Sequence, residues 1–321
     1  MQEGERHLVV IARALLAVGL DRLAERFEIR EGGLEATREQ LLELVPGASA
    51  VVADPAVPVD RDLLDAAGQQ LQLVANFAVG YDNVDLDACR ERGVAVTNTP
   101  DVLTEATAEL ALALTLSAAR RLSDAERDLR QGRWLGWDPG AYLGLELHGA
   151  TAGVIGMGRI GRRYARLVSA LGAQVVYASP SPEPEAEREL GAKRMGLPAV
   201  LASAEVISVH APSTPETHQL IGADELDLIG PQGVLVNTSR GSLVDAEAVA
   251  AALADGRLGA AGLDVYENEP EVPQALLAAP RCVLLPHIGS ASTRARRSMA
   301  LLVADNVIAV LEGGEPVSPV G

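Results

Sequence analysis

Short apolar segments alternate with segments of helical periodicity along nearly the whole chain. In the first hundred residues, the apolar segments predict strands at His7–Ile11, Ser49–Ala53, Leu71–Ala75 and Val94–Thr97. The stretches between them predict helices, among them Gly19–Phe27 and Arg38–Leu44. The strands are continuously apolar, which is typical of a parallel sheet buried on both faces. We therefore predict a small α/β unit in this part of the chain.

A second α/β series begins at Ala150. Its apolar segments are TAGVIG, AQVVYA, EVISVH, GVLVNTS, AAGLDVY and CVLLPHI, and each is followed by turn or helix signals. Six strands in one series suit a dinucleotide-binding sheet. The periodicity of Ser292–Glu312 predicts a last helix, which ends before a pair of glycines.

A long helix rich in Ala and Leu, starting at Thr104, is predicted between the two series. Few polar residues interrupt it, so we predict that it is buried nearly all round, as a crossing between domains or in a subunit interface. Residues 124–149 carry Trp134, Trp137 and several glycines, and they predict an arm or loop.

The composition limits the classes of partner. The chain has 321 residues, which suits two domains, and its net charge is −17. Nucleic acid and anionic membrane are therefore not expected as partners, because a phosphate backbone needs a basic surface. A small anionic substrate held by an arginine is compatible with this charge. Lys193 is the single lysine, and its acid-rich surroundings do not favour Schiff-base chemistry.

Further classes are disfavoured by individual residue types. Two cysteines, Cys89 and Cys282, cannot form a disulfide framework or a cysteine metal cluster. No histidine spacing indicates a metal site, so we predict no metal. The polar N-terminus MQEGERH is unlike a signal peptide, and Glu105 and Glu109 interrupt the longest apolar helix. We expect a soluble, cytoplasmic protein.

A glycine-rich turn, GMGRIG at Gly156–Gly161, is the strongest local motif. It follows an apolar strand and opens a helix, which is the context that a dinucleotide-binding fingerprint requires. Gly156 permits the tight turn, Gly158 admits the pyrophosphate, and Gly161 lets helix and strand pack closely. The free N–H groups of the helix N-terminus favour the phosphates.

The residue that reads the adenine ribose is expected about 20 residues further on. The sequence there is YASPSP, with neither an acidic residue that selects NAD nor an arginine that binds the 2′-phosphate of NADP. Ser179 and Ser181 offer hydroxyl groups for that phosphate, or they only cap a turn. The missing carboxylate removes a repulsion, so we lean to NADP over NAD.

Three polar residues follow the predicted strands of the second series. Arg240 comes after VLVNTS, Glu269 lies in DVYENEP, and His287 lies in LLPHIGS. The carboxyl ends of parallel strands meet where ligands bind, so we expect these side chains to form an acid–base and anion-binding group. His210, which ends the run EVISVH, is expected to line the cofactor crevice, whereas His7, His148 and His218 are expected to be structural or on the surface.

Taken together, GMGRIG, VNTSRG, GLDVYENEP and PHIGS resemble the D-isomer-specific 2-hydroxyacid dehydrogenases. The resemblance extends over nearly the whole chain. NFAVGYDNVD, VTNTPDVLTEATAELALAL and the tryptophans of the arm are most similar to the glyoxylate and hydroxypyruvate reductase branch.

The resemblance implies an α/β fold with two parallel-sheet domains, Rossmann-like and flavodoxin-like, and an active-site cleft between them. Residues 1–98 and 289–321 would form a discontinuous substrate-binding domain, and residues 99–288 the NAD(P)-binding domain. The long helix and the arm would support a homodimer. Trp134 or Trp137 would reach the partner's active site or only pack in the dimer.

Roles for individual residues also follow from the resemblance. His287 would be the general acid in keto-acid reduction, Glu269 would favour its imidazolium form, and Arg240 would bind the substrate. The N–H groups of Val79 and Gly80 would hold the substrate carboxylate. The positions that match cofactor contacts are Thr107, Gly156, Met157, Gly158, Arg159, Ile160, Ser179, Ser181, Ala211, Pro212, Thr217, Thr238, Ser239, Asp264 and Gly289.

The implied reaction is the reduction of glyoxylate to glycolate and of hydroxypyruvate to D-glycerate with NADPH or NADH. Two alternatives stay open at this point. One is another dehydrogenase of the family, acting on a larger 2-hydroxy acid or on phosphite. The other is a non-catalytic NAD(H) sensor similar to the carboxy-terminal binding corepressors, because those proteins retain the same three residues.

Overall fold

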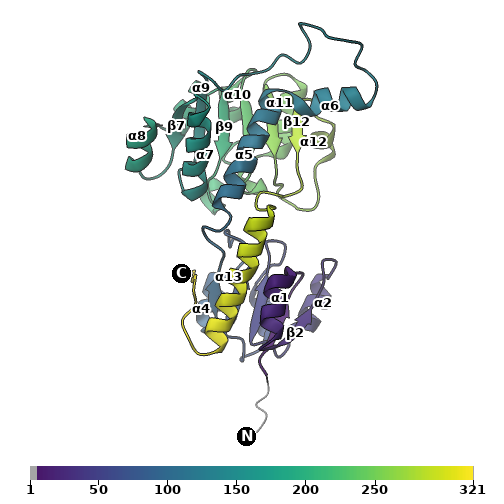
Figure 1. Ribbon diagram of the computed structural model, residues 1–321, viewed down its shortest axis with the longest axis vertical. Coiled ribbons are helices and arrows are strands. Elements are labelled where there is room, and N and C mark those ends of the chain that lie inside the picture. The colour runs from purple at the N-terminus through teal and green to yellow at the C-terminus, as the bar shows by residue number, and fades with distance from the viewer. Residues whose placement is uncertain (1–5, 321) are drawn as a thin grey trace. The chain divides into compact units, whose positions relative to one another are not determined.

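The computed structural model describes residues 6–320, so most of the N-terminal segment on which the absence of a signal peptide was predicted lies outside the described residues. The chain forms two compact units, each built around one parallel sheet (Figure 1). The first unit holds the chain up to Leu103 and again from Ser290, and the second holds Thr104–Gly289. The predicted α/β class with two parallel sheets is thus confirmed.

The first unit has a five-stranded sheet in the order β2-β1-β3-β4-β5, which is the flavodoxin-like order. Its strands are β1 (Leu8–Ile11), β2 (Glu28–Glu31), β3 (Ala50–Ala53), β4 (Leu73–Asn76) and β5 (Ala95–Thr97). Four of them fall on the predicted apolar segments. The segment EIRE of β2 carries no apolar signal because this strand lies at an edge and is largely open to solvent.

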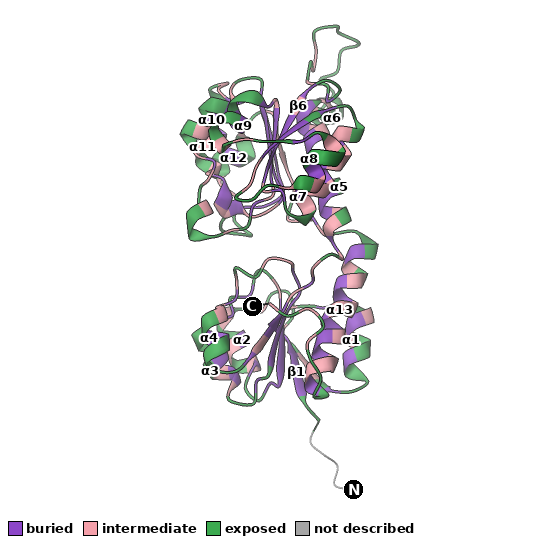
Figure 2. Cartoon of the chain, turned by 90° about the vertical axis from the view of Figure 1, so that its left-hand side faces the viewer, coloured by how far each residue is buried: buried purple, intermediate pink, exposed green. Residues whose placement is uncertain are grey.

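Helices cover both faces of the first sheet (Figure 2). One face carries α1 (Ala17–Ala24) and α13 (Thr293–Leu311), and the other carries α2 (Arg38–Leu44), α3 (Arg61–Ala67) and α4 (Leu86–Glu91). Both faces of the sheet are therefore buried, which explains the continuous apolar strands. The predicted helix at Ser292–Glu312 is α13, and its Ser292 side chain accepts a hydrogen bond from the Ala295 N–H.

The second unit has a seven-stranded parallel sheet in the order β12-β11-β10-β9-β6-β7-β8. Its strands are β6 (Thr151–Ile155), β7 (Gln174–Ala178), β8 (Lys193–Arg194), β9 (Val206–Val209), β10 (Val234–Asn237), β11 (Ala260–Leu263) and β12 (Cys282–Leu284). The strand order reverses between β6 and β9, which makes their carboxyl ends the switch point of a dinucleotide-binding fold. The count of six strands was wrong, because β8 is a polar, two-residue edge strand without an apolar signal.

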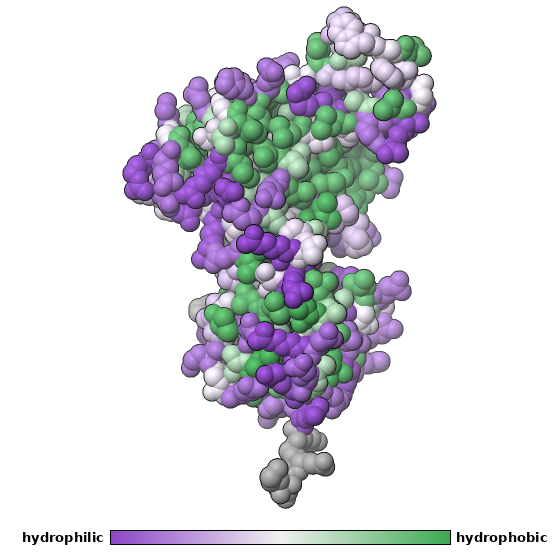
Figure 3. Space-filling view, in the orientation of Figure 1, coloured by the Kyte–Doolittle hydropathy of each residue, from purple (hydrophilic) through white to green (hydrophobic). Residues whose placement is uncertain are grey.

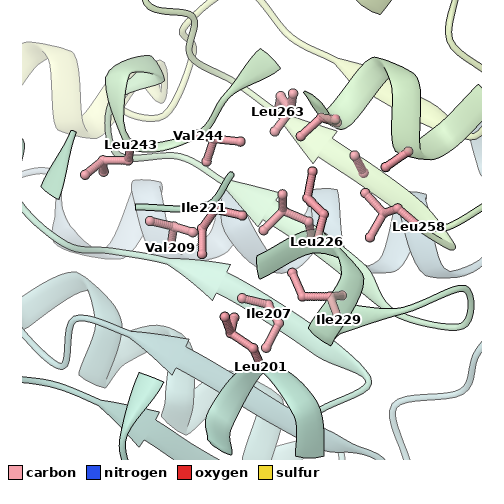
Figure 4. Close-up of a cluster of buried hydrophobic side chains, with 14 of the residues drawn as sticks. Leu201, Ile207, Val209, Ile221, Leu226, Ile229, Leu243, Val244, Leu258 and Leu263 are labelled. Atoms are coloured by element: carbon pink, nitrogen blue, oxygen red, sulfur yellow. The ribbon is translucent and has the colours of Figure 1, made fainter. Parts of the chain in front are cut away.

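Eight α-helices surround this sheet in the part of the chain that the structure describes. They are α5 (Thr104–Ala119), α6 (Leu122–Arg130), α7 (Arg159–Ala170), α8 (Pro184–Leu190), α9 (Leu197–Ser203), α10 (Ala223–Ile229), α11 (Ala246–Ala254) and α12 (Gln274–Ala278). Two short 3-10 helices, η1 (Pro215–Thr217) and η2 (Gly241–Leu243), follow β9 and β10. Figure 4 shows the apolar core that the sheet forms with α9 and α10, in which Leu201, Ile207 and Leu226 are buried. Among the described residues, no helix is both long and apolar enough to cross a membrane.

The connection between the two series consists of the helices α5 and α6 and the loop that follows them. Within this single chain, α5 is buried through residues such as Ala108, Ala111 and Leu114, whereas Glu105 and Glu109 are exposed. Burial of the remaining surface in a subunit interface stays a prediction. The segment expected as a loop from residue 124 begins inside a helix, α6, whose charged residues make it amphipathic and largely exposed.

Candidate active site

The glycine-rich turn lies between β6 and α7, at the switch point of the second sheet. Gly156 has φ of +89°, and a Cβ atom there would lie 2.6 Å from the backbone nitrogen of Ala211. A Cβ atom on Gly161 would lie 2.1 Å from the Gly156 carbonyl oxygen. At Gly158, by contrast, a Cβ atom would meet nothing within 4 Å. The turn is therefore closely packed from behind and open at the N-terminus of α7, as a bound pyrophosphate requires.

Four buried polar atoms on α5 and at the carboxyl ends of the second sheet's strands have no hydrogen-bond partner within residues 6–320: Thr107 Oγ1, His210 Nδ1, Thr238 Oγ1 and Asp264 Oδ2. They come from α5 and from the residues that follow β9, β10 and β11. Unpaired buried polar atoms are rare in folded proteins, so this group fits a ligand rich in hydrogen-bonding atoms. A nicotinamide dinucleotide is such a ligand.

His210, the histidine among these four residues, is not protonated under physiological conditions. Burial lowers the pKa of His210 to about 3, so its ring is neutral at physiological pH. Its Nε2 atom lies 2.9 Å from the Ser208 hydroxyl oxygen, and the ring packs against Tyr164 at a centroid distance of 5.0 Å. His210 can therefore line a cofactor site, but it is poorly suited to donate a proton there.

The remaining cofactor positions lie in four places. Met157 is buried in the apolar core, so only its backbone can face a ligand, while Arg159 and Ile160 begin α7. The loop after β9 contains Ala211, Pro212 and Thr217. The Thr217 hydroxyl donates to the Pro212 carbonyl oxygen at 2.8 Å. The Ser239 hydroxyl donates to the Val209 carbonyl oxygen at 3.0 Å and so ties the ends of β9 and β10 together. Gly289 lies beside two of the unpaired atoms, since a Cβ there would be 3.3 Å from Asp264 Oδ2 and 3.7 Å from Thr107 Oγ1.

The sheet brings His287 and Glu269 together from segments that follow β12 and β11. His287 Nδ1 lies 2.7 Å from Glu269 Oε2, and the Tyr266 backbone N–H donates to Glu269 Oε1 at 3.0 Å. His287 has φ of +53°, and its backbone N–H donates to the Asp264 carbonyl oxygen at 2.8 Å. Because Glu269 engages Nδ1, the Nε2 atom is the one left to face a substrate. The His287 side chain is about one-third exposed, which permits that approach.

The electrostatics of the pair favour a charged carboxylate. Burial by itself raises the pKa of Glu269, but the hydrogen bonds from His287 and the Tyr266 N–H, and the charges of His287 and Arg240, outweigh it and lower the pKa. Glu269 is therefore ionised at neutral pH, and its negative charge lies against the His287 ring. Burial also raises the pKa of Asp264, whose Oδ1 atom accepts a hydrogen bond from the Ile288 N–H at 2.8 Å.

Arg240 is held beside this pair by the turn that follows β10. The Asn237 side chain donates to the Arg240 carbonyl oxygen at 2.8 Å, and Arg240 Nη1 donates to the Ser239 carbonyl oxygen at 2.9 Å. A Cβ atom on Gly241 would lie 1.9 Å from the Tyr266 carbonyl carbon, so only glycine allows the two turns to approach this closely. The structure thus gathers all three predicted residues at the carboxyl ends of neighbouring strands.

Val79 and Gly80 follow β4 in the first unit. Their carbonyl oxygens accept hydrogen bonds at 2.8 Å, from Asn98 Nδ2 and Asn76 Nδ2 respectively. Their backbone N–H groups donate to no acceptor within residues 6–320. The loop therefore presents two free donors, which suits an anion. No local pattern predicted the role of the two asparagines, because they act on backbone atoms that only the folded loop brings to them.

The expected ribose site is the turn after β7. It contains Ser179, which is half-buried, and Ser181, which is exposed. The turn itself contains no arginine, as its sequence shows, but the folded chain brings one to it from β8. Arg194, the last residue of β8, donates from Nε to the Ser179 carbonyl oxygen at 3.0 Å and from Nη2 to the Pro180 carbonyl oxygen. The pairing of β7 with β8 brings this guanidinium to the turn.

Comparison with known proteins places this geometry in a family. Residues 112–289 match the NAD-binding domain of the D-isomer-specific 2-hydroxyacid dehydrogenases. A glyoxylate reductase of Thermococcus onnurineus is 42% identical over 96% of this chain and 94% of its own length.

Solved structures agree with the sequence relatives. A protein from Thermus thermophilus is 43% identical, with a TM-score of 0.91 over 98% of this chain and 100% of its own. An NADPH-dependent glyoxylate/hydroxypyruvate reductase from Sinorhizobium meliloti, solved with NADP and malonate, is 39% identical, with a TM-score of 0.86 over 98% of this chain and 97% of its own. The chain therefore belongs to the D-isomer-specific 2-hydroxyacid dehydrogenase family, in its glyoxylate reductase branch.

Proposed function

We propose that the protein reduces small 2-keto acids with NADPH or NADH, converting glyoxylate to glycolate and hydroxypyruvate to D-glycerate. The observation that carries the proposal is the hydrogen-bonded pair of His287 and Glu269 with Arg240 beside it, at the carboxyl edge of the same sheet that carries the glycine-rich turn. The names of the relatives support the same substrates.

Each residue of the site has one task in this proposal. A bound nicotinamide supplies the hydride. His287 donates a proton from Nε2 to the carbonyl oxygen of the substrate, and Glu269 holds the ring and favours its charged form. Arg240 binds the substrate and stabilises the negative charge that develops on that oxygen. The N–H groups of Val79 and Gly80 bind the substrate carboxylate, which makes the first unit the substrate-binding domain and the second unit the cofactor-binding domain.

The direct test is an absorbance assay of the purified protein with each keto acid and each cofactor in parallel. We expect rapid loss of NAD(P)H absorbance with glyoxylate or hydroxypyruvate. Tight cofactor binding without loss in either case would overturn the proposal. Larger 2-keto acids, and phosphite in the oxidising direction, would then be assayed in the same way. Turnover of one of them would indicate another dehydrogenase of the family. Cofactor binding without turnover of any of them would indicate a sensor.

The lowered pKa of Glu269 leads to a pH prediction. Its carboxylate is present above its ordinary pKa of 4.5 and favours the imidazolium form of His287. In Glu269→Gln this charge is lost, so the basic limb of the reduction rate should move to lower pH. The pH profile of kcat, measured for both proteins, checks this. An unmoved basic limb would remove Glu269 from control of the proton.

We also propose that the protein is a homodimer through α5 and the arm. The arm exposes Trp134, Leu135 and Trp137, with Leu135 99% exposed. The face of the second unit on which α5 lies in Figure 1 is rich in apolar atoms in Figure 3. Exposed apolar surface of this kind favours association, and a second copy of the chain is the partner that the half-buried α5 suits.

A charge placed on the arm should weaken this dimer. We expect Leu135→Asp to shift the sedimentation equilibrium toward the mass of a single chain, because an ionised carboxylate resists burial in an interface. Leu34→Asp is the matched control, since Leu34 is an exposed leucine of the first unit, which does not contain the arm. Equal masses for wild type and Leu135→Asp would exclude Leu135 from the interface.

A further inference from the structure

The ribose turn after β7 carries a basic group that the local sequence conceals. Arg194 lies 15 residues beyond Ser179, yet two of its N–H groups donate to the carbonyl oxygens of Ser179 and Pro180. In the parallel pairing of β7 with β8, Arg194 stands opposite Tyr177. The guanidinium is therefore fixed at the carboxyl edge of the sheet, where the adenine ribose of a dinucleotide is bound in this fold.

The acidic residues near this turn are engaged elsewhere. Glu187 accepts a hydrogen bond from the Tyr177 hydroxyl at 2.7 Å. The Glu183 carboxylate lies 3.6 Å from Arg162, and Glu185 and Glu189 form ion pairs with Arg166 on α7. Within residues 6–320, by contrast, Arg194 makes no ion pair with a carboxylate. In a chain of net charge −17, the charge of this guanidinium is thus left for a ligand.

The donors match a phosphate group. A guanidinium has five N–H donors in a planar fork, and the two backbone contacts leave three. The hydroxyls of Ser179 and Ser181 belong to the same turn, and no acidic side chain stands where the ribose hydroxyls of NAD would be read. An arginine near this position is the usual means of accepting a 2′-phosphate.

We propose that Arg194, with the hydroxyls of Ser179 and Ser181, binds the 2′-phosphate of NADP(H) and sets the cofactor preference of the protein. This rests on the proposed function only in taking a nicotinamide dinucleotide as the cofactor. The new element is the residue that recognises the phosphate, Arg194, which lies on the edge strand β8 and not in the turn itself.

The test compares four ligands on the full-length protein by equilibrium titration: NADPH, NADH, adenosine 2′,5′-bisphosphate and adenosine 5′-monophosphate. Wild type should bind each ligand that carries the 2′-phosphate more tightly than its counterpart. Arg194→Ala should weaken the two phosphorylated ligands by about 10- to 100-fold, which is the range for hydrogen bonds to a charged group. The other two ligands should change far less. Arg194→Lys should retain part of the preference, because a point charge cannot reproduce the fork.

Lys193→Ala is the matched control. It removes one positive charge from the same two-residue strand, but successive strand side chains point to opposite faces, so the preference should stay at the wild-type value. If Arg194→Ala weakens all four ligands equally, the arginine only shapes the turn, and the proposal fails. It also fails if wild type shows no preference for the 2′-phosphate. No keto acid enters these titrations, so failure of the reductase assay and failure of this proposal are separate results.

Discussion

Replacing His287 with asparagine should lower the turnover of keto-acid reduction by roughly 100- to 10,000-fold, the contribution typical of a positioned general acid. The reason is the geometry of the pair. Glu269 fixes Nδ1 at 2.7 Å, which leaves Nε2 as the proton donor. Asparagine has no titrating proton, but it tolerates the φ of +53° at this position better than most residues, so the backbone can keep its conformation. Steady-state kinetics with saturating cofactor measure the loss.

Two further measurements make this result specific. The dissociation constant of the cofactor should be unchanged in His287→Asn, because His287 serves the substrate in this mechanism. The double variant His287→Asn/Glu269→Gln should be no slower than His287→Asn alone, since Glu269 acts through the histidine and such effects do not add. Wild-type turnover in His287→Asn would exclude His287 as the acid, and additive losses would give Glu269 a separate role.

Arg240→Lys should lower kcat/KM by roughly 100-fold or more, although the charge is retained. The guanidinium can offer two parallel N–H donors to a carboxylate or carbonyl oxygen, whereas an ammonium group is a compact charge on a flexible chain. The turn around Arg240 is also narrow, because Gly241 packs against the Tyr266 backbone. A lysine there cannot move its backbone to recover the contact.

The division of the loss between kcat and KM identifies the role of Arg240. A fall in both kcat and kcat/KM would show that the arginine stabilises the transition state, whereas a rise in KM alone would restrict it to substrate binding. The matched control is Arg257→Lys, because Arg257 is a partly exposed arginine of the same unit that pairs with Asp227. Near-wild-type kinetics in Arg240→Lys would mean that this arginine is structural.

The three residues proposed as catalytic could be predicted to lie together because their positions depend on strand ends. The segments VLVNTS, AAGLDVY and CVLLPHI are apolar enough to mark buried parallel strands, and Arg240, Glu269 and His287 follow them. Carboxyl ends of neighbouring parallel strands meet at one edge, so local patterns were sufficient to bring the three residues together. The distances and the shared contact with the Tyr266 N–H required the structure.

Other features lie outside the reach of local patterns. The strands β2 and β8 are polar and lie at sheet edges, so they carry no apolar signal. The helix α6 is charged and largely exposed, so it resembles a polar loop in the sequence. The extent of burial along the Ala- and Leu-rich helix α5 depends on what packs against it, which the sequence of the helix does not encode.

By itself, the sequence determined the α/β class, the two parallel sheets, the glycine-rich turn and the residues at the strand ends. These follow from hydrophobic period and turn chemistry, which neighbouring residues encode. Only the tertiary structure decided which buried polar groups are left unpaired, and that Arg194 lies against the turn after β7. The physical reason is that such contacts join residues far apart in the sequence, and their partners are set by the order of the strands in the sheet.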